Sequence, residues 1–216
     1  MMITETLVQK AEKEYGMSWL YEDSRYALMD FITTFINDRR FFDDMDILKE
    51  ASLDLIVAAN MAEAHFQKPF DGWLPKSGTF GATTLRPYHV DYTTASENEW
   101  YWTSDGSSGP LAFQEWFSVE TDQTEVLFIY GYFNTSLIPN TRELQFTAGG
   151  KQLPVWNIEQ LFSKQDRYFL LPRTITIDIN STFKGEASVR SLSTVESMGL
   201  IGIYFSTEGR LVRQSG

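Results

Sequence analysis

The chain has 216 residues, 43% of them hydrophobic and 15% aromatic, which is enough apolar material for a core and excludes a disordered chain. Its net charge of -11 argues against a nucleic-acid backbone as the main partner, because phosphate binding needs clustered Lys and Arg. The chain has no Cys, which excludes disulfides, thiolate nucleophiles and Cys-based metal sites. No apolar run approaches the roughly 18 residues that a membrane helix needs, and we expect no signal peptide.

Residues 1–66 are predicted to be helical. Within residues 24–36 the apolar side chains recur at helical spacing, at Leu28, Phe31, Ile32, Phe35 and Ile36. Asp43 or Asp44 is expected to cap a second helix, since both side chains suit a helix N-terminus. Together these helices form a predicted hairpin over residues 18–66, with a shorter helix before it.

The second helix is expected to run to about His65 and to be buried on several sides. Its apolar seam consists of Leu48, Ala51, Leu55, Ala58 and Ala62. Further apolar residues lie off this seam, so more than one side of the helix must be covered. Residues 1–66 hold 13 acidic and 6 basic residues, so the outer face of the helices is expected to be acidic and solvated.

From residue 67 the amino-acid composition changes to one that predicts turns and strands. Residues 69–110 are rich in Gly, Pro, Ser, Thr and Asp, so strands there must be short. Residues 113–119 alternate, with Phe113, Glu115, Phe117 and Val119 predicted on one side. Residues 125–133 are almost continuously apolar, as a central strand buried on both faces would be.

The later strands are equally regular. Residues 143–147 are predicted to form a strand, 148–150 a tight turn and 151–156 the partner strand. Ile175, Ile177 and Ile179 alternate with polar residues, so that strand has one dry face. We expect the layer facing it to be an opposing sheet that contains residues 125–133.

A run of helices followed by a run of strands predicts an α+β fold with an antiparallel sheet. The predicted architecture is an N-terminal helical region, residues 1–66, followed by a jelly-roll-like β-sandwich, residues 67–216. Roughly eight short strands match the scale of a sandwich or jelly roll.

No catalytic site is predicted. His65 ends a helix and His89 follows Pro87 in a loop-rich segment, so both favour structural roles over a catalytic triad or a metal site. Glu97 and Glu99 would share one face of an extended strand, but nothing specifies the cleft that a glycosidase needs, and solvated surface acids are favoured. We therefore expect no enzyme, no cofactor and no metal.

Four tryptophans are candidates for an interface or a sugar-stacking platform: Trp73, Trp100, Trp102 and Trp116. Core or interface positions are favoured for each of them. The Trp100-Tyr101-Trp102 triplet, if extended, places a bulky aromatic on each side of its strand, and a neighbouring subunit is a natural cover for such a side chain.

The C-terminal half, about residues 111–213, resembles single jelly-roll structural proteins of phages and archaeal viruses. The resemblance depends on Leu171-Pro172 before the alternating isoleucines, and on Gly199 and Gly202 among aliphatic residues. It implies a capsid, minor capsid or capsid-decorating protein. The helical residues 1–66 depart from the basic or short N-terminal arm that is more usual in such capsid proteins.

The function expected from this resemblance is that of a non-enzymatic structural protein of a virion, assembled in the host cytoplasm. It would bind other copies of itself or a coat protein through apolar and aromatic interfaces, without direct nucleic-acid contact. The alternative is a glycan-binding β-sandwich module that uses exposed tryptophans. A third reading is an enzyme with Glu97 and Glu99 as its acid pair.

Overall fold

The computed structural model describes residues 2–37, 45–73, 76–90, 100–106, 109, 111–136, 139–158 and 167–207. Three helices come first: α1 (Met2–Tyr15), α2 (Glu22–Ile36) and α3 (Met45–Phe66). The strands and one short 3-10 helix follow: β1 (Gly81–Thr84), η2 (Pro87–Val90), β2 (Trp102–Thr103), β3 (Gln114–Glu120), β4 (Glu125–Asn134), β5 (Thr141–Ala148), β6 (Lys151–Gln152), β7 (Trp156–Asn157), β8 (Tyr168–Ile177), β9 (Thr182–Val189), β10 (Val195–Glu196) and β11 (Met198–Ser206).

The strands form two main antiparallel sheets. One has the order β1-β11-β4-β8, and the other has the order β3-β9-β5-β6, with β7 also paired to β5. The pairs are nested: β1 pairs with β11, β3 with β9, β4 with β8, and β5 with β6. Such nesting, around a central hairpin, gives a jelly roll of two packed sheets. The predicted fold class, α+β with an antiparallel jelly-roll sandwich, is confirmed.

The central hairpin turns where the sequence predicted it. Gly149 and Gly150 have φ values of +54° and +75°, which the tight turn between β5 and β6 requires and which glycine adopts without strain. The predicted partner strand is present in two pieces, β6 and β7, both paired with β5.

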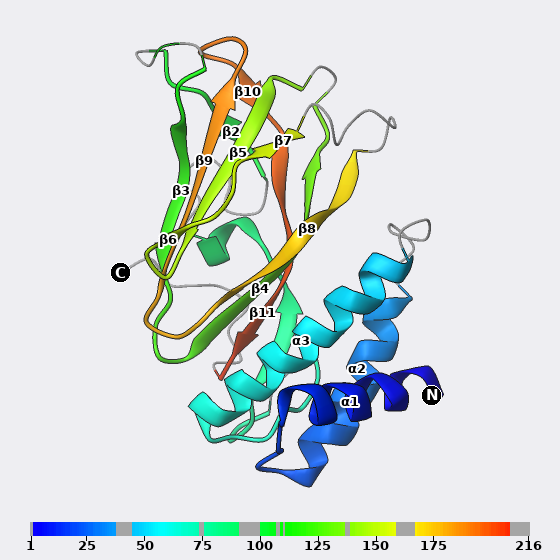
Figure 1. The fold of residues 1–216 in the computed structure, drawn as a ribbon. Coiled ribbons are helices and arrows are strands. Elements are labelled where there is room, and N and C mark those ends of the chain that lie inside the picture. The colour runs from blue at the N-terminus through cyan, green and yellow to red at the C-terminus, as the bar shows by residue number, and fades with distance from the viewer. Residues whose placement is uncertain are drawn as a thin grey trace.

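The molecule has three layers (Figure 1), in which the helices cover part of the outer face of the β1-β11-β4-β8 sheet. A first apolar cluster joins all three helices to that outer face, and a second fills the space between the sheets. The alternation of β4 explains both clusters, because Phe128 and Tyr130 belong to the first and Leu127 and Ile129 to the second. The prediction of a central strand buried on both faces is confirmed.

The helices match their predicted stripes. All five apolar residues named for residues 24–36 are buried. In α3 the seam residues Ala51, Leu55, Ala58 and Ala62 are buried, and so are Ile56 and Ala59 off the seam. The expectation that this helix is covered on several sides is confirmed. Asp43 and Asp44, and the side chain of Leu48, lie outside the described residues.

The prediction that residues 125–133 lie in the sheet facing Ile175 and Ile177 is wrong. Both residues are buried, but β8 lies beside β4 in the same sheet, with Ile175 opposite Ile129 and Ile177 opposite Leu127. The facing layer is the β3-β9-β5-β6 sheet. Periodicity shows that one face is dry, but it does not show which strand is a neighbour and which is opposite. Ile179 lies beyond the end of β8 and packs against the cluster under the helices.

The simple alternation predicted for residues 113–119 is also wrong. The pairing of β3 with β9 shifts register between Glu115 and Phe117, and this bulge turns both Trp116 and Phe117 into the core between the sheets. A bulge adds one residue to one strand, so the side-chain pattern changes phase there.

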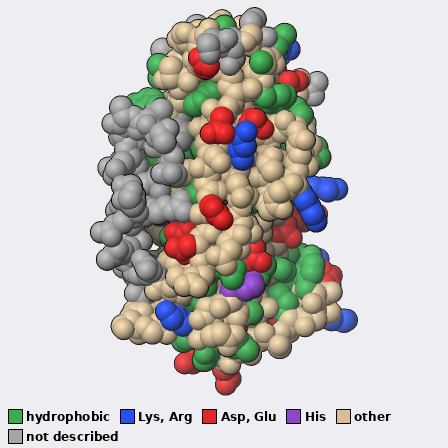
Figure 2. Space-filling view, turned by 90° about the vertical axis from the view of Figure 1, so that its left-hand side faces the viewer, with side chains coloured by type: hydrophobic (Ala, Val, Ile, Leu, Met, Phe, Trp, Pro, Cys, Tyr) green, Lys and Arg blue, Asp and Glu red, His purple; other side chains and the backbone are tan. Residues whose placement is uncertain are grey.

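Charged side chains are spread thinly over the face shown in Figure 2, where no large basic patch is seen.

Within the described residues, no helix is both long and apolar enough to cross a membrane.

Candidate ligand-binding hollow

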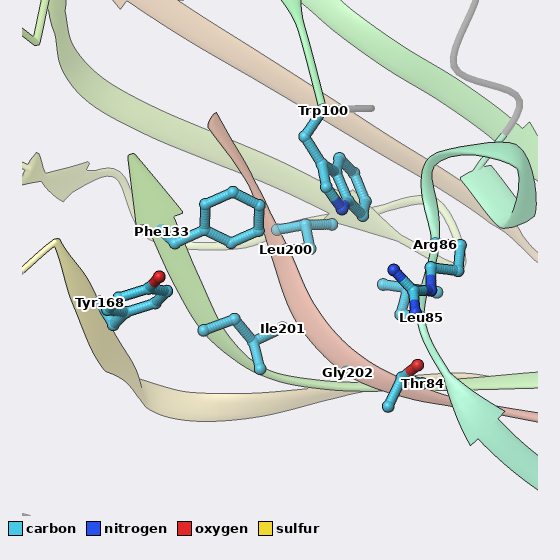
Figure 3. Close-up of a pocket in the computed structure, with 9 residues that line it drawn as sticks. All are labelled: Thr84, Leu85, Arg86, Trp100, Phe133, Tyr168, Leu200, Ile201 and Gly202. Carbon is cyan, nitrogen blue, oxygen red and sulfur yellow. The ribbon is translucent and has the colours of Figure 1, made fainter. Parts of the chain in front are cut away.

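The helices leave the part of the outer sheet face near the start of β8 and the end of β4 uncovered, and a hollow lies there. Its volume is about 310 Å³. Figure 3 shows the lining residues, which come from β1 and the turn after it, from β4, β8 and β11, and from the segment before β2: Thr84, Leu85, Arg86, Trp100, Phe133, Tyr168, Leu200, Ile201 and Gly202.

Three aromatic side chains, Trp100, Phe133 and Tyr168, form one wall; we call them the aromatic row. The ring centroids of Trp100 and Phe133 are 6.0 Å apart with the rings perpendicular, and those of Phe133 and Tyr168 are 6.1 Å apart. Tyr168 is 39% exposed, and the other two rings are half-buried. The row therefore offers partly solvated apolar surface without needing a rearrangement of the core.

Gly199 of β11 shapes this wall, and Gly202 of the same strand packs tightly against the neighbouring backbone. A Cβ atom at Gly199 would overlap the rings of Trp100 and Phe133, so the absence of a side chain lets both rings lie against the strand. A Cβ at Gly202 would lie 2.5 Å from the carbonyl oxygen of Phe128. The glycines noted in the sequence thus have a packing reason in this sheet.

A β-bulge places Tyr168 at the end of the row. Between Ile129 and Gly131 of β4, the paired residue on β8 moves from Ile175 to Leu170, so β8 carries extra residues around Pro172. Proline cannot donate a hydrogen bond to the ladder, and a bulge is where a strand tolerates it.

The polar groups of the hollow are Arg86, Thr84 and the Tyr168 hydroxyl. The side chains of Arg86 and Thr84 are exposed, and the Arg86 guanidinium makes no hydrogen bond or ion pair with any described residue. In Figure 3 Arg86 lies at the opposite end of the hollow from Tyr168. Among the described residues, the lining contains no carboxylate and no imidazole, so these residues are suited to binding and supply no acid–base pair.

His89 supports this site from beneath. The backbone N–H of Arg86 donates to Nδ1 of His89 at 3.0 Å, and the imidazole is buried and stacked on Tyr204 with centroids 3.9 Å apart. Its geometry fits the structural role that the sequence favoured.

Tyr204 and Glu125 form a buried pair within the β1-β11-β4-β8 sheet. The Tyr204 hydroxyl donates to Glu125 Oε1 at 2.6 Å. Burial, followed by the nearby Glu125 carboxylate, raises the pKa of Tyr204 far above its ordinary value. A proton that is held this firmly is unsuited to transfer at neutral pH.

Glu196 is a second buried carboxylate, 1% exposed, and its oxygens accept several hydrogen bonds. It accepts hydrogen bonds from Asn134 Nδ2 at 2.8 Å, from the backbone N–H of Asn140 at 2.6 Å and from the Thr141 hydroxyl at 2.5 Å. These bonds tie β10 to the β4–β5 connection, which is a structural use of a buried charge.

The structure separates the four predicted tryptophans. Trp102 and Trp116 are buried at 4% and 5% exposure in the core between the sheets. Trp73 is 38% exposed and packs on Phe31, with centroids 4.6 Å apart. Only Trp100 lines the hollow, so no platform joins all four.

Other sequence candidates lie elsewhere. His65 Nε2 is 2.9 Å from Asp178 Oδ1, so this residue links the end of α3 to the connection after β8. Glu97 and Glu99 lie outside the described residues. Among the residues that the structure describes, no group of three or more His, Asp or Glu is placed to hold a metal ion.

A second hollow, of about 340 Å³, lies between the start of α3 and β8. It differs in chemistry, because Glu50 and Asp54 lie with Arg173 in its lining. The Thr174 hydroxyl donates to Asp54 Oδ2 at 2.6 Å, which joins the helix to the sheet.

The sequence named Trp100 but missed Arg86, Phe133 and Tyr168. Phe133 was predicted only as part of the strand at residues 125–133, and the order of the strands is what places it beside Tyr168. Arg86 carried one weak signal: with Lys76, it is one of two cations in the turn-rich residues 69–110 of an acidic chain.

No family model and no curated protein matches this chain. Solved structures show weak likeness. A family 35 carbohydrate-binding module from an environmental isolate is 9% identical and has a TM-score of 0.27, over 67% of this chain and 99% of that one. The insecticidal delta-endotoxin Cry8Ea1 from Bacillus thuringiensis is 9% identical with a TM-score of 0.28, over 64% and 25%.

A third likeness is to dimeric latent PorU from Porphyromonas gingivalis, 9% identical with a TM-score of 0.25, over 59% of this chain and 12% of that one. The chain thus spans about an eighth of PorU and a quarter of the endotoxin. At these scores the likenesses carry no argument about function, and the jelly-roll assignment depends on the strand order alone.

Proposed function

We propose that this protein is a non-enzymatic structural component of a virus particle, either a capsid, minor capsid or capsid-associated protein. The observation that carries the proposal is the part of the outer sheet face that the helices leave uncovered, with its aromatic row, on a jelly roll that has an apolar core between its sheets. Exposed aromatic surface on an otherwise compact protein is typical of an interaction site. The partner is another copy of the chain or a coat protein.

The charge of the helical region and the expected setting complete the proposal. The 13 acidic and 6 basic residues of positions 1–66 keep the helical layer solvated or bound to a basic partner. The particle is assembled in the host cytoplasm, and the protein contacts no nucleic acid directly. It needs no cofactor.

Native mass measurement of the purified protein, over a range of concentrations and with any coat protein encoded beside it, tests the proposal. We expect a defined oligomer or a coat-protein complex that Tyr168→Glu disrupts. Tyr26→Glu is the matched control, because Tyr26 is 59% exposed on the helical layer. A protein that stays monomeric at high concentration and binds no particle component would contradict the proposal.

The hollow itself favours a second candidate function, that of a glycan-binding module. Aromatic side chains give flat apolar contact with a polar edge, and the lining adds hydroxyls and one cation. Of the four tryptophans in the sequence-based version of this idea, Trp100 is the one that lines the hollow. Glycan binding that survives Trp100→Ala would remove this candidate.

A further inference from the structure

We propose that the hollow binds a saccharide that carries a carboxylate, with the sugar against the aromatic row and the carboxylate on Arg86. The proposal rests on the glycan-binding function above and deepens it by naming the ligand class. It is independent of whether the protein assembles into a particle.

The size and shape of the hollow suit a short saccharide. A volume of about 310 Å³ is at the lower end of the range for small-molecule sites, roughly 300–1,000 Å³. The wall opposite Arg86 is Phe133 and Tyr168, with Trp100 between the two ends, as Figure 3 shows. A ligand that spans the hollow thus meets apolar rings at one end and a cation at the other.

Arg86 supplies the charge argument. None of the described residues that line the hollow with Arg86 is acidic, although the chain as a whole carries a net charge of -11. The second hollow offers the contrast, because Arg173 shares its lining with two acidic residues, Glu50 and Asp54. A cation whose described neighbours in the lining are all uncharged, beside half-buried aromatic rings, is complementary to an anionic ligand.

A carboxylate fits the donors of the hollow. A guanidinium presents parallel N–H groups that match the two oxygens of a carboxylate. Here the backbone N–H of Arg86 is held by His89, which fixes the turn from which the side chain extends. The Thr84 and Tyr168 hydroxyls, at opposite ends of the hollow, are available for sugar hydroxyls.

The experiment is a titration followed by tryptophan fluorescence and calorimetry, with two pairs of probes. One pair is an oligogalacturonate and its fully methyl-esterified form; the other is 3′-sialyllactose and lactose. We expect the carboxylated member of at least one pair to bind about tenfold more tightly than its neutral partner. The two pairs distinguish a uronic acid from a sialic acid as the source of the carboxylate.

The charge-removing variant Arg86→Gln should abolish that preference while the neutral probe binds as before. Arg173→Gln removes the same charge on the same sheet, outside the hollow, and should leave the preference intact. Both residues are exposed, so folding is expected to survive, and a circular dichroism melt checks it.

Two results would overturn the inference. Equal binding of charged and neutral probes, lost on Trp100→Ala, would retain the glycan-binding function and reject the role of Arg86. Failure of every probe to bind at millimolar concentration would reject both, and leave assembly measured by native mass as the surviving proposal.

Discussion

The outer face of the β1-β11-β4-β8 sheet has two parts with similar residues. One part is buried under the helices, and the other is partly solvated. In the covered part, aromatic and aliphatic side chains such as Tyr130 and Phe205 pack under the helices; Phe35 of α2, for example, meets Tyr130 with centroids 4.8 Å apart. In the uncovered part, the aromatic row remains partly solvated beside Arg86. Burial of apolar surface stabilises a fold, so an aromatic row that stays partly solvated is better explained by a binding partner than by folding.

The largest expected effect comes from the covered part. Phe31 is 2% exposed and contacts Phe70, Trp73 and Phe205, so Phe31→Ala should lower the free energy of unfolding by about 3–5 kcal/mol. Tyr168→Ala in the uncovered part should lower it by less than about 1 kcal/mol. Denaturant unfolding of both variants measures the contrast, and similar losses would show that the uncovered part is also structural.

The glycines of β11 offer a finer comparison. Gly202→Ala forces a Cβ against a backbone carbonyl, which cannot rotate away, and should cost about 2–3 kcal/mol. Gly199→Ala meets two aromatic rings of the aromatic row, which can rotate, and should cost about 1–2 kcal/mol.

A spectroscopic readout separates these two variants. Gly199→Ala should shift the tryptophan fluorescence through Trp100 and weaken ligand binding, because it displaces the wall of the hollow. An unfolded Gly199→Ala variant with a stable Gly202→Ala variant would reverse the order and show that the row is part of the core.

The sequence predicted the covered part better than the uncovered one. The stripe from Leu28 to Ile36 and the continuous apolar run of β4 each show burial directly, because periodicity reports which faces are dry. The hollow depends on which strands are neighbours. Phe133 lies beside Tyr168 only because β4 pairs with β8, and no pattern within either strand contains that information.

Errors in the sequence reading had the same origin. The bulge at Trp116 and the position of β8 beside β4 both depend on pairing between distant segments. Local patterns located the strands at residues 113–119, 125–133 and 143–147 in outline, while register and strand order, which place the candidate site, are set by long-range contacts.

The inner face of the same sheet gives a pH-dependent prediction. Because burial raises the pKa of Tyr204, the protonated phenol is favoured in the folded state. Stability is therefore fully present below the ordinary tyrosine pKa of about 10 and is lost as the pH rises above it. Tyr204→Phe should cost about 1 kcal/mol at pH 7, through the lost hydrogen bond to Glu125, and should reduce the alkaline loss.

Unfolding free energies at neutral pH and at about pH 11 test this. Tyr26→Phe is the control, since an exposed tyrosine should leave the alkaline loss unchanged. A wild-type protein whose stability is the same at both pH values would contradict the burial argument.

The smallest effect is expected at the edge of the helical layer. His65 and Asp178 join the end of α3 to the connection after β8, but their side chains are 33% and 43% exposed. Water and salt screen such a pair, so His65→Gln should change the free energy of unfolding by less than about 1 kcal/mol. A double-mutant cycle with Asp178→Asn measures the pair itself. A coupling well above that value would mean that the helices are held at this edge by a specific contact. A small coupling would mean that this contact adds little to the apolar packing of α3, and that the covered part ends where the apolar contacts of α3 end.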